Sequence, residues 1–427
     1  MRWIVLASLL LGQAAAAELP PFLYTAAAQY DTTAWGRSAE RFPAGAHLVV
    51  VTRGVRRDLA PAFFASADAA VSWDGKRVLF AGRASAADRW QIWEAELSGG
   101  APKRVVTSAE DCIRPLYLPN AKIVYTRVTA AGSVIEVATA EGIKDVLTHA
   151  PGRYLTDDVL RDGRILFESR DELFTVYPDG TGVESVRCDH GPKRAGARQL
   201  ASGDVIFNSG GALARYSSAL TAQQKLPQLM VDVGGAVAEV AADLWLVAAR
   251  PRGGTFYSIH QTGPAGGLTE VAEAPRNDNA LDPVVVTARV APREFPSGLV
   301  ATRSTGNLLC LNVREAKVPV TGEVHAVRFY TQDDAGASQL LGQTSPAADG
   351  SFYVEVPANR PIRMELVDAA GTRLQGEQHW FWLRPSEQRV CVGCHSGPER
   401  APENKVPEIL NKIQVPVKMT GNPGRGR

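Results

Sequence analysis

The sequence lacks an excess of charge of either sign, because its 46 lysines and arginines are matched by 45 aspartates and glutamates. Proteins that bind nucleic acid usually carry a clear basic excess, so this balance favours no such partner. The sequence also lacks the Gly-x-Ser-x-Gly, His-Glu-x-x-His and phosphate-loop motifs. These absences leave the serine hydrolase, zinc protease and nucleotide-binding classes without a sequence signal.

A hydrophobic run long enough to span a membrane is also missing. The clearest apolar run lies at the N-terminus, where Arg2 precedes residues 3–11 and four alanines follow at 14–17. A transmembrane helix needs about 20 apolar residues, and this run is shorter. The pattern predicts a secretory signal peptide over residues 1–17, with an uncleaved N-terminal anchor as the alternative. We therefore expect a periplasmic mature protein without stable membrane insertion.

Glycine and proline, by contrast, are abundant, with 39 and 27 residues among short apolar runs. A turn followed by a short apolar strand recurs five times. The five strands begin at Val78, Ile123, Ile165, Val205 and Leu244. Their spacings of 45, 42, 40 and 39 residues are close to the length of one four-stranded propeller blade.

These repeats predict an all-β fold that begins with a TolB/WD40-like β-propeller at residues 46–282, after an N-terminal extension at 18–45. Five blades are visible. Leu48–Val51 and the segment after Leu281 are expected to close the ring, for six or seven blades. An array of ordinary β-sandwiches is the alternative. The Asp-Gly-Lys turn at 74–76 resembles turns of exported TolB-type propellers, which implies a fold and leaves the function open.

A second domain is expected after the propeller. Three prolines at 283, 292 and 296 predict an extended crossover over residues 283–297. Alternating apolar residues at 352, 354 and 356 predict a half-buried strand within a small β-sandwich at 298–383. Residues 384–414 form a separate C-terminal segment with one short helix, and residues 415–427 are expected to be a disordered tail.

The strongest chemical signal is the sequence Cys391-Val-Gly-Cys394-His395 in that C-terminal segment. The two thiols of a Cys-x-x-Cys-His motif are close enough to attach to the two vinyl groups of a porphyrin, and the histidine is then delivered to the iron. We therefore predict one covalent haem c, held by Cys391 and Cys394 with His395 as an axial ligand. Its attachment requires the cytochrome c maturation machinery.

Three other interpretations of this motif remain open. A structural zinc site normally needs a second pair of ligands, and the chain has no second Cys-x-x-Cys. A redox dithiol is expected at the start of a helix in a thioredoxin-like unit, whereas this region has the pattern of strand and loop. A structural disulfide between Cys391 and Cys394 is compatible with an oxidising compartment.

A second axial ligand is less well defined by the sequence. His379 lies twelve residues before the motif, and Met419 follows the predicted short helix. An open sixth coordination site is the third alternative. The aromatic run 380–382 is expected to form either the wall of a haem pocket or plain core, and Arg384 and Arg389 to pair with haem propionates.

The remaining cysteines, Cys112, Cys188 and Cys310, can form at most one disulfide among themselves. Cys188 and His190 lie close together and carry groups that bind metals, although such an isolated cluster is usually an ordinary loop.

The segments 349–362, 382–387 and 391–395 resemble the middle domain of the hydrazine synthase alpha subunit and the exported bacterial proteins related to it. The resemblance spans about residues 280–405 and implies a propeller, a β-domain and a c-type haem. In that family, a tyrosine four residues after the motif histidine ligates the first haem, and the histidine binds zinc. Here that position is Glu399, and Tyr353 is the last tyrosine. The resemblance therefore does not extend to the tyrosine ligand, and we expect ligation through His395.

The second haem motif of that family is also missing, so the resemblance does not carry hydrazine synthesis to this chain. The leading hypothesis is a periplasmic monohaem c-type cytochrome that transfers electrons, with the propeller docking a redox partner protein or a small molecule. One alternative is a haem enzyme that acts on a small substrate, such as a nitrogenous one, at an open iron site. The other is a haem-free propeller that serves as a binding module.

Overall fold

The computed structural model describes residues 18–31, 34, 40–187, 193–218, 221–226, 231–251, 253–273, 278–316, 318–333, 335–377, 379–393, 405–412 and 415–420. The predicted signal peptide 1–17 and the residues Cys188, His190, Cys394 and His395 lie outside this part of the chain. The described residues form eight four-stranded sheets, which confirms the predicted all-β class. Among the helices described, none has the length and apolar character that a membrane span requires.

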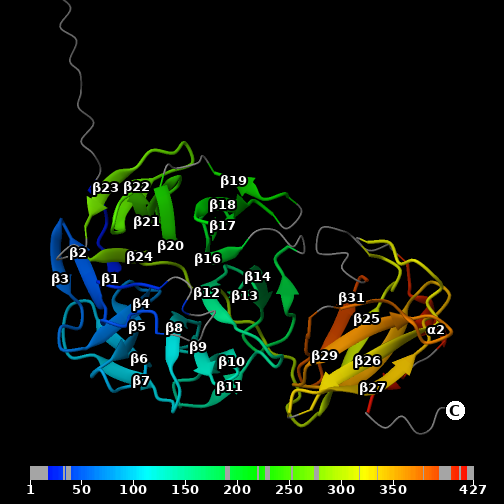
Figure 1. Cartoon of the computed structure of the whole chain (residues 1–427). Helices are drawn as coiled ribbons and strands as arrows, with labels where there is room; N and C mark the ends of the chain where they lie inside the picture. Colours follow the sequence, from blue (N-terminus) through cyan, green and yellow to red (C-terminus); the bar gives the residue numbers. More distant parts are fainter. Residues whose placement is uncertain are drawn as a thin grey trace, which may run out of the picture.

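Six of the sheets form a ring, drawn from blue to green in Figure 1. Five of them contain strands that follow one another along the chain. The first two are β4 (Ala65–Val71), β5 (Arg77–Arg83), β6 (Gln91–Glu96), β7 (Lys103–Val106), and β8 (Cys112–Tyr117), β9 (Ile123–Thr129), β10 (Gly132–Ala138), β11 (Lys144–Val146). The third and fourth are β12 (Leu155–Val159), β13 (Ile165–Ser169), β14 (Glu172–Val176), β15 (Glu184–Ser185), and β16 (Arg194–Gln199), β17 (Val205–Ser209), β18 (Ala212–Tyr216), β19 (Gln224–Lys225). The fifth is β20 (Val231–Ala241), β21 (Leu244–Pro251), β22 (Ser258–Thr262), β23 (Thr269–Ala272).

The five strands predicted from the repeat are the second strands of these five sheets: β5, β9, β13, β17 and β21. They are the most recognisable because each follows a tight turn and is buried on both faces. In β5, for example, Val78, Leu79 and Phe80 are all fully buried. The repeat in the sequence therefore marks one particular strand of each blade.

The sixth sheet joins the two ends of the propeller. Its order is β24 (Asn279–Val285), β1 (Phe22–Ala27), β2 (His47–Thr52), β3 (Val55–Asp58). β2 contains Leu48–Val51 and β24 contains Leu281, so the two segments expected to close the ring do share one sheet. β1 lies between them, within the segment 18–45 that the sequence placed ahead of the propeller. All six residues of β1 are buried, so it shows none of the alternation by which a strand is recognised.

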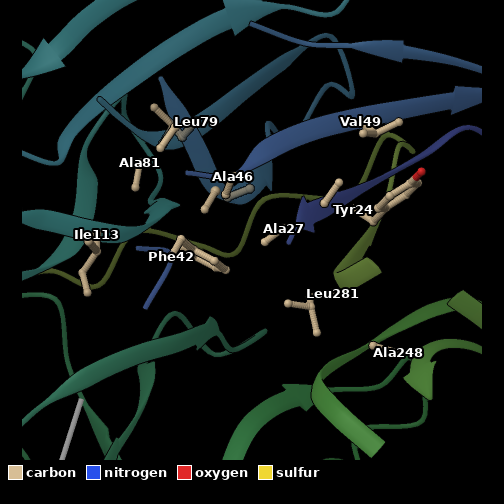
Figure 2. Close-up of a cluster of buried hydrophobic side chains, with 14 of the residues drawn as sticks. Tyr24, Ala27, Phe42, Ala46, Val49, Leu79, Ala81, Ile113, Ala248 and Leu281 are labelled. Atoms are coloured by element: carbon tan, nitrogen blue, oxygen red, sulfur yellow. The ribbon is translucent and has the colours of Figure 1, made fainter. Parts of the chain in front are cut away.

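Apolar side chains of neighbouring blades pack against one another in a shared buried cluster. Figure 2 shows Ala27 of β1 and Leu281 of β24 in one buried cluster with Leu79 of β5 and Ala248 of β21. The cluster contains side chains from both the first and the last strand of the propeller, so closure of the ring buries apolar surface as well as pairing strands.

The other two sheets form the predicted sandwich, in yellow and orange in Figure 1. Residues 286–300, between propeller and sandwich, contain no strand or helix, but the crossover was expected to begin at 283, and residues 283–285 belong to β24. One sheet is β31 (Gln388–Cys391), β25 (Thr305–Cys310), β28 (Phe352–Pro357), β32 (Val417–Lys418). The other is β27 (Ser338–Thr344), β26 (Ala326–Gln332), β29 (Ile362–Val367), β30 (Arg373–Gly376). The alternation predicted for β28 is confirmed, since Phe352, Val354 and Val356 are buried in the core between the sheets.

Two segments predicted to lie outside the sandwich are parts of it. β31 carries Cys391 and pairs in parallel with β25, although residues 384–414 were expected to be a separate segment. The short helix α2 (Glu408–Lys412) lies in the expected region. β32 pairs with β28, and Met419 is buried in the sandwich core, so residues 415–420 are ordered where a disordered tail was expected. Burial of Met419 provides apolar contacts that the Pro- and Gly-rich composition does not reveal.

Candidate functional site

The sandwich docks on the propeller through Arg384, which is 4% exposed. Its Nε donates to the carbonyl of Asp179 at 2.9 Å, and its Nη1 donates to the carbonyl of Val146 and to Asn359 Oδ1, both at 3.0 Å. Its Nη2 forms an ion pair with Asp145. Arg384 was expected to face haem propionates, but its hydrogen bonds instead hold the two domains together.

His149 of the propeller completes this contact. Its Nε2 lies 2.6 Å from Nη1 of Arg384, and its ring lies edge-on to Trp382, with the centroids 6.4 Å apart. Burial and the neighbouring Arg384 charge lower the pKa of His149 to about 4. The imidazole is therefore neutral at pH 7 and accepts a hydrogen bond from the guanidinium.

Between the two docked domains lies a cavity of about 320 Å³, a size within the usual range for small-molecule and cofactor sites. Its walls are mainly apolar. The propeller contributes Tyr154, Phe167, Ser169, Arg170, Glu172, Phe174, Val183 and Ser185. The sandwich contributes Leu308, Met364, Glu377, His379, Trp380, Phe381, Trp382, Arg389 and Cys391.

Cys391 reaches this cavity from the last position of β31. It lies opposite Cys310 in the parallel pairing of β31 with β25. A hydrogen bond from the Cys310 side chain lowers the pKa of the Cys391 thiol, and the Cys391 Sγ contacts the carbonyl of Gly393 at 3.2 Å. No disulfide involves Cys112, Cys310 or Cys391 within the described part of the chain. The thiol of the predicted attachment motif therefore lies at the wall of an apolar cavity.

The aromatic run 380–382 forms one wall of the cavity. Trp382 is 3% exposed and inserts among propeller residues, with its ring perpendicular to that of Tyr154 at a centroid distance of 5.9 Å. Phe381 is fixed through two backbone hydrogen bonds to Ile362. The two interpretations of this run, pocket wall and core, both describe it: Trp382 packs in the propeller core and also lines the cavity.

Two residues that line the cavity each carry a buried polar atom without a hydrogen-bond partner among the described residues: Trp382 Nε1 and Ser185 Oγ. A buried donor without an acceptor destabilises a fold by about 1–3 kcal/mol, so native proteins usually satisfy such groups. The mainly apolar lining with a few polar residues, such as His379 and Arg389, suits a largely apolar group that carries a few polar atoms, which is the character of a haem.

The structure separates the two candidates for a second axial ligand. His379 lines the cavity and is exposed, whereas Met419 is 2% exposed inside the sandwich core. Its sulfur packs close to Gly342 of β27. His379 therefore lies on the same cavity as Cys391, and Met419 does not.

Arg389 is the other predicted propionate partner, and it does line the cavity. Its guanidinium forms a 2.8 Å ion pair with Glu387. Residues of the propeller wall, above all Tyr154, Phe167 and Arg170, were not identified from the sequence. Their local sequence is that of any propeller blade, and they line a cavity only because the sandwich docks against them.

The family of the hydrazine synthase alpha subunit middle domain matches residues 313–396 of this chain, a stretch that includes the Cys-x-x-Cys-His motif. Hydrazine synthase subunit alpha of Kuenenia stuttgartiensis is 33% identical over 61 residues, which cover 14% of this chain and 8% of that protein. The sequence match thus spans a small part of the relative's length.

The solved structure of Kuenenia stuttgartiensis hydrazine synthase matches with a TM-score of 0.80 at 17% identity. The match covers 92% of this chain and 72% of that chain, so propeller and sandwich share one overall fold with it. TolB from Acinetobacter baumannii matches with a TM-score of 0.49 at 14% identity, over 62% of this chain and 66% of that chain.

Proposed function

We propose that this chain is an exported, periplasmic c-type haem protein whose single haem occupies the cavity between propeller and sandwich and binds a small ligand at its iron. The observation that carries the proposal is the position of Cys391, the first cysteine of the attachment motif, at the wall of that cavity. The likeness to hydrazine synthase supports an enzyme that acts on a small nitrogenous substrate.

The described residues have separable roles in this proposal. Cys391 anchors the porphyrin edge from a strand, and a strand holds its position more rigidly than a loop does. The aromatic wall with Phe167 and Phe174 excludes water and lowers the local dielectric constant. Arg389, which lines the cavity, would pair with a propionate. When bound, a haem supplies a redox-active iron with coordination sites for ligands.

Electron transfer is the second candidate function, and the position of His379 favours it. A histidine on the wall of the same cavity as Cys391 is a suitable sixth ligand. If His379 ligates the iron, no site remains for a substrate. The two functions therefore differ in whether the sixth coordination position of the iron is open or occupied by His379.

The proposal is tested by expressing the full chain with and without a cytochrome c maturation system. We expect the intact mass to rise by that of one haem and the visible absorbance to survive denaturation. Cys391→Ser is expected to abolish double attachment, and Cys112→Ala, which removes a buried thiol of β8 far from the motif, is expected to leave haem content unchanged. A polypeptide with its bare mass under maturation conditions refutes the proposal.

Carbon monoxide then distinguishes the two candidate functions. An open iron site takes up carbon monoxide readily in the reduced protein, and a site closed by His379 resists it. In the closed case, His379→Ala is expected to convert a low-spin absorption spectrum into a high-spin one. An unchanged spectrum excludes His379 as the sixth ligand.

A further inference from the structure

A second cavity, of about 600 Å³, lies at the centre of the propeller. Each of the six innermost strands has an irregular register, or bulge, along its pairing with the next strand. A bulge re-aims the side chain that it carries. The residues at these positions all line the cavity: Asp68, Arg114, Asp157, Gly196, Gly235 and Asp282. The blades thus present equivalent positions to one central channel.

The charges deep in this channel are paired with one another. Nη1 of Arg114 lies 3.1 Å from carboxylate oxygens of both Asp157 and Glu168. Asp68 is paired with Arg41 at 2.6 Å. Burial and the adjacent Glu168 carboxylate raise the pKa of Asp157. Asp68, Asp157 and Glu168 therefore interact mainly with neighbouring arginines, whereas Asp282 accepts a hydrogen bond from the backbone N–H of Ala236.

At one end of the channel, which we call the channel mouth, basic residues outnumber acidic ones. At the ends of the strands around this mouth stand five basic and two acidic residues that line the cavity: Arg153, Arg170, Lys193, Arg194, Arg250, Asp171 and Asp232. Among the described residues of this mouth, five positive charges minus two negative ones leave a formal surplus of three. The ion pairs Lys193–Asp171 (3.4 Å) and Arg250–Asp232 (3.0 Å) use both acids. A concave basic rim of this kind attracts small anions.

Arg170 connects this mouth with the cavity beside Cys391. Ser169 and Arg170 line both cavities. Arg170 and Asp171 form the two-residue turn between β13 and β14, with φ angles of +53° and +65°. The corresponding turn of the next blade is Gly210–Gly211, where such angles cost nothing. An arginine in the left-handed region is strained relative to glycine, and this turn presents Arg170 at the wall that both cavities share.

We propose that the mouth of the propeller channel binds a small inorganic anion and passes it to the cavity beside Cys391, with Arg170 selecting for negative charge. The binding step needs only the propeller. The delivery step rests on the proposed function, because its destination is the haem. The proposed ligand is an anion of the size of nitrite or azide, and the residues common to both cavities, Ser169 and Arg170, form the wall that it would cross.

The chain supplies a matched control for Arg170. Arg53 occupies the same position of the two-residue turn between β2 and β3, with a φ of +50°, and its side chain is 83% exposed. It lines neither cavity. Arg53→Gly and Arg170→Gly therefore remove the same charge and relieve a similar backbone strain, although Arg53 pairs with Glu18 and Arg170 donates to the carbonyl of Pro151.

The first experiment tests binding without reference to haem. Crystals of the full chain are soaked in sodium bromide, and anomalous scattering locates the anion. We expect a bromide peak at the channel mouth in the wild type and in Arg53→Gly, and its loss in Arg170→Gly. A peak that persists in Arg170→Gly, or no peak at the mouth of the wild type, overturns the anion site.

The second experiment tests delivery in the haem-loaded protein. Association of azide with the oxidised protein is compared with association of carbon monoxide, a neutral ligand, with the reduced protein. We expect Arg170→Gly to slow azide by about tenfold and leave carbon monoxide unchanged, and the wild-type azide rate to fall with ionic strength. Arg53→Gly is expected to change neither rate.

Three results overturn delivery. Equal slowing of both ligands by Arg170→Gly makes Arg170 a residue that positions the haem, and equal effects of the two glycine variants make the charge effect non-specific. If the iron takes up neither azide nor carbon monoxide, it has no open position to which an anion could be delivered. A chain that attaches no haem refutes the proposed function, and the bromide experiment still decides the anion site.

Discussion

At the scale of single residues, the contact between Arg384 and His149 combines charge with burial. His149 has a pKa of about 4 in the folded protein, against about 6.5 in an unfolded chain. Below pH 6.5 the unfolded state therefore binds a proton that the folded state does not. The free energy of unfolding is fully maintained above pH 6.5 and decreases as the pH falls toward 4.

We predict that this group alone reduces the free energy of unfolding by up to about 3 kcal/mol between pH 6.5 and pH 4. His149→Gln keeps an acceptor for Arg384 and removes the titration, so its stability is expected to fall less over the same range. Urea unfolding at a series of pH values measures the difference. Parallel pH profiles for the two proteins contradict the prediction, because they mean that His149 does not titrate on unfolding.

At the scale of elements, the β13–β14 turn holds Arg170 in a left-handed conformation that lowers the stability of the fold. The left-handed conformation costs a non-glycine residue about 1–2 kcal/mol, which glycine avoids. Glycine gives back about 0.5–1 kcal/mol of this gain, because its unfolded state has more conformational entropy. We predict that Arg170→Gly raises the free energy of unfolding by about 0.5–1 kcal/mol. Chemical denaturation measures it.

Arg53→Gly in the β2–β3 turn is expected to give a similar gain in stability, because its φ is nearly the same. The two variants thus gain stability together, while only Arg170→Gly is expected to lose anion binding. Destabilisation by Arg170→Gly alone contradicts the interpretation of this turn as strained, and shows instead that its side-chain contacts, such as the hydrogen bond to the carbonyl of Pro151, dominate.

At the scale of the whole molecule, docking of the sandwich on the propeller creates the cavity. Arg384 contributes hydrogen bonds to propeller carbonyls that are more than 200 residues away in sequence. Removal of one partner from a buried, charged contact typically costs about 3–5 kcal/mol. The exposed end of its ion pair, Asp145, places the expected loss at the lower end of that range.

We predict that Arg384→Met loosens the domain interface by about 3 kcal/mol, so that protease cleaves the crossover 286–300 faster and the two domains unfold in separate thermal transitions. Arg373→Met is the control, because Arg373 lies on the same domain and is 55% exposed. Unchanged cleavage together with a single unchanged transition in Arg384→Met refutes the role of Arg384 as the interdomain anchor.

The parts of this protein that are local in sequence were determined by the sequence alone. The forty-residue repeat marked β5, β9, β13, β17 and β21, and the two-residue alternation marked β28. The Cys-x-x-Cys-His motif pointed to Cys391 in the same way, and haem attachment there stays a prediction. Such patterns are readable because hydrophobic burial imposes a period on a strand, or on a blade, wherever it occurs.

The tertiary structure alone decided what lies far apart in sequence. It joined β1 to β24 in the closing blade, put Met419 in the sandwich core and His379 on the cavity, and used Arg384 as an interdomain anchor. Docking also brought Arg170 to the wall that the two cavities share. These outcomes depend on how a closed ring and a sandwich pack together. A local sequence pattern does not determine which distant surface a side chain will contact.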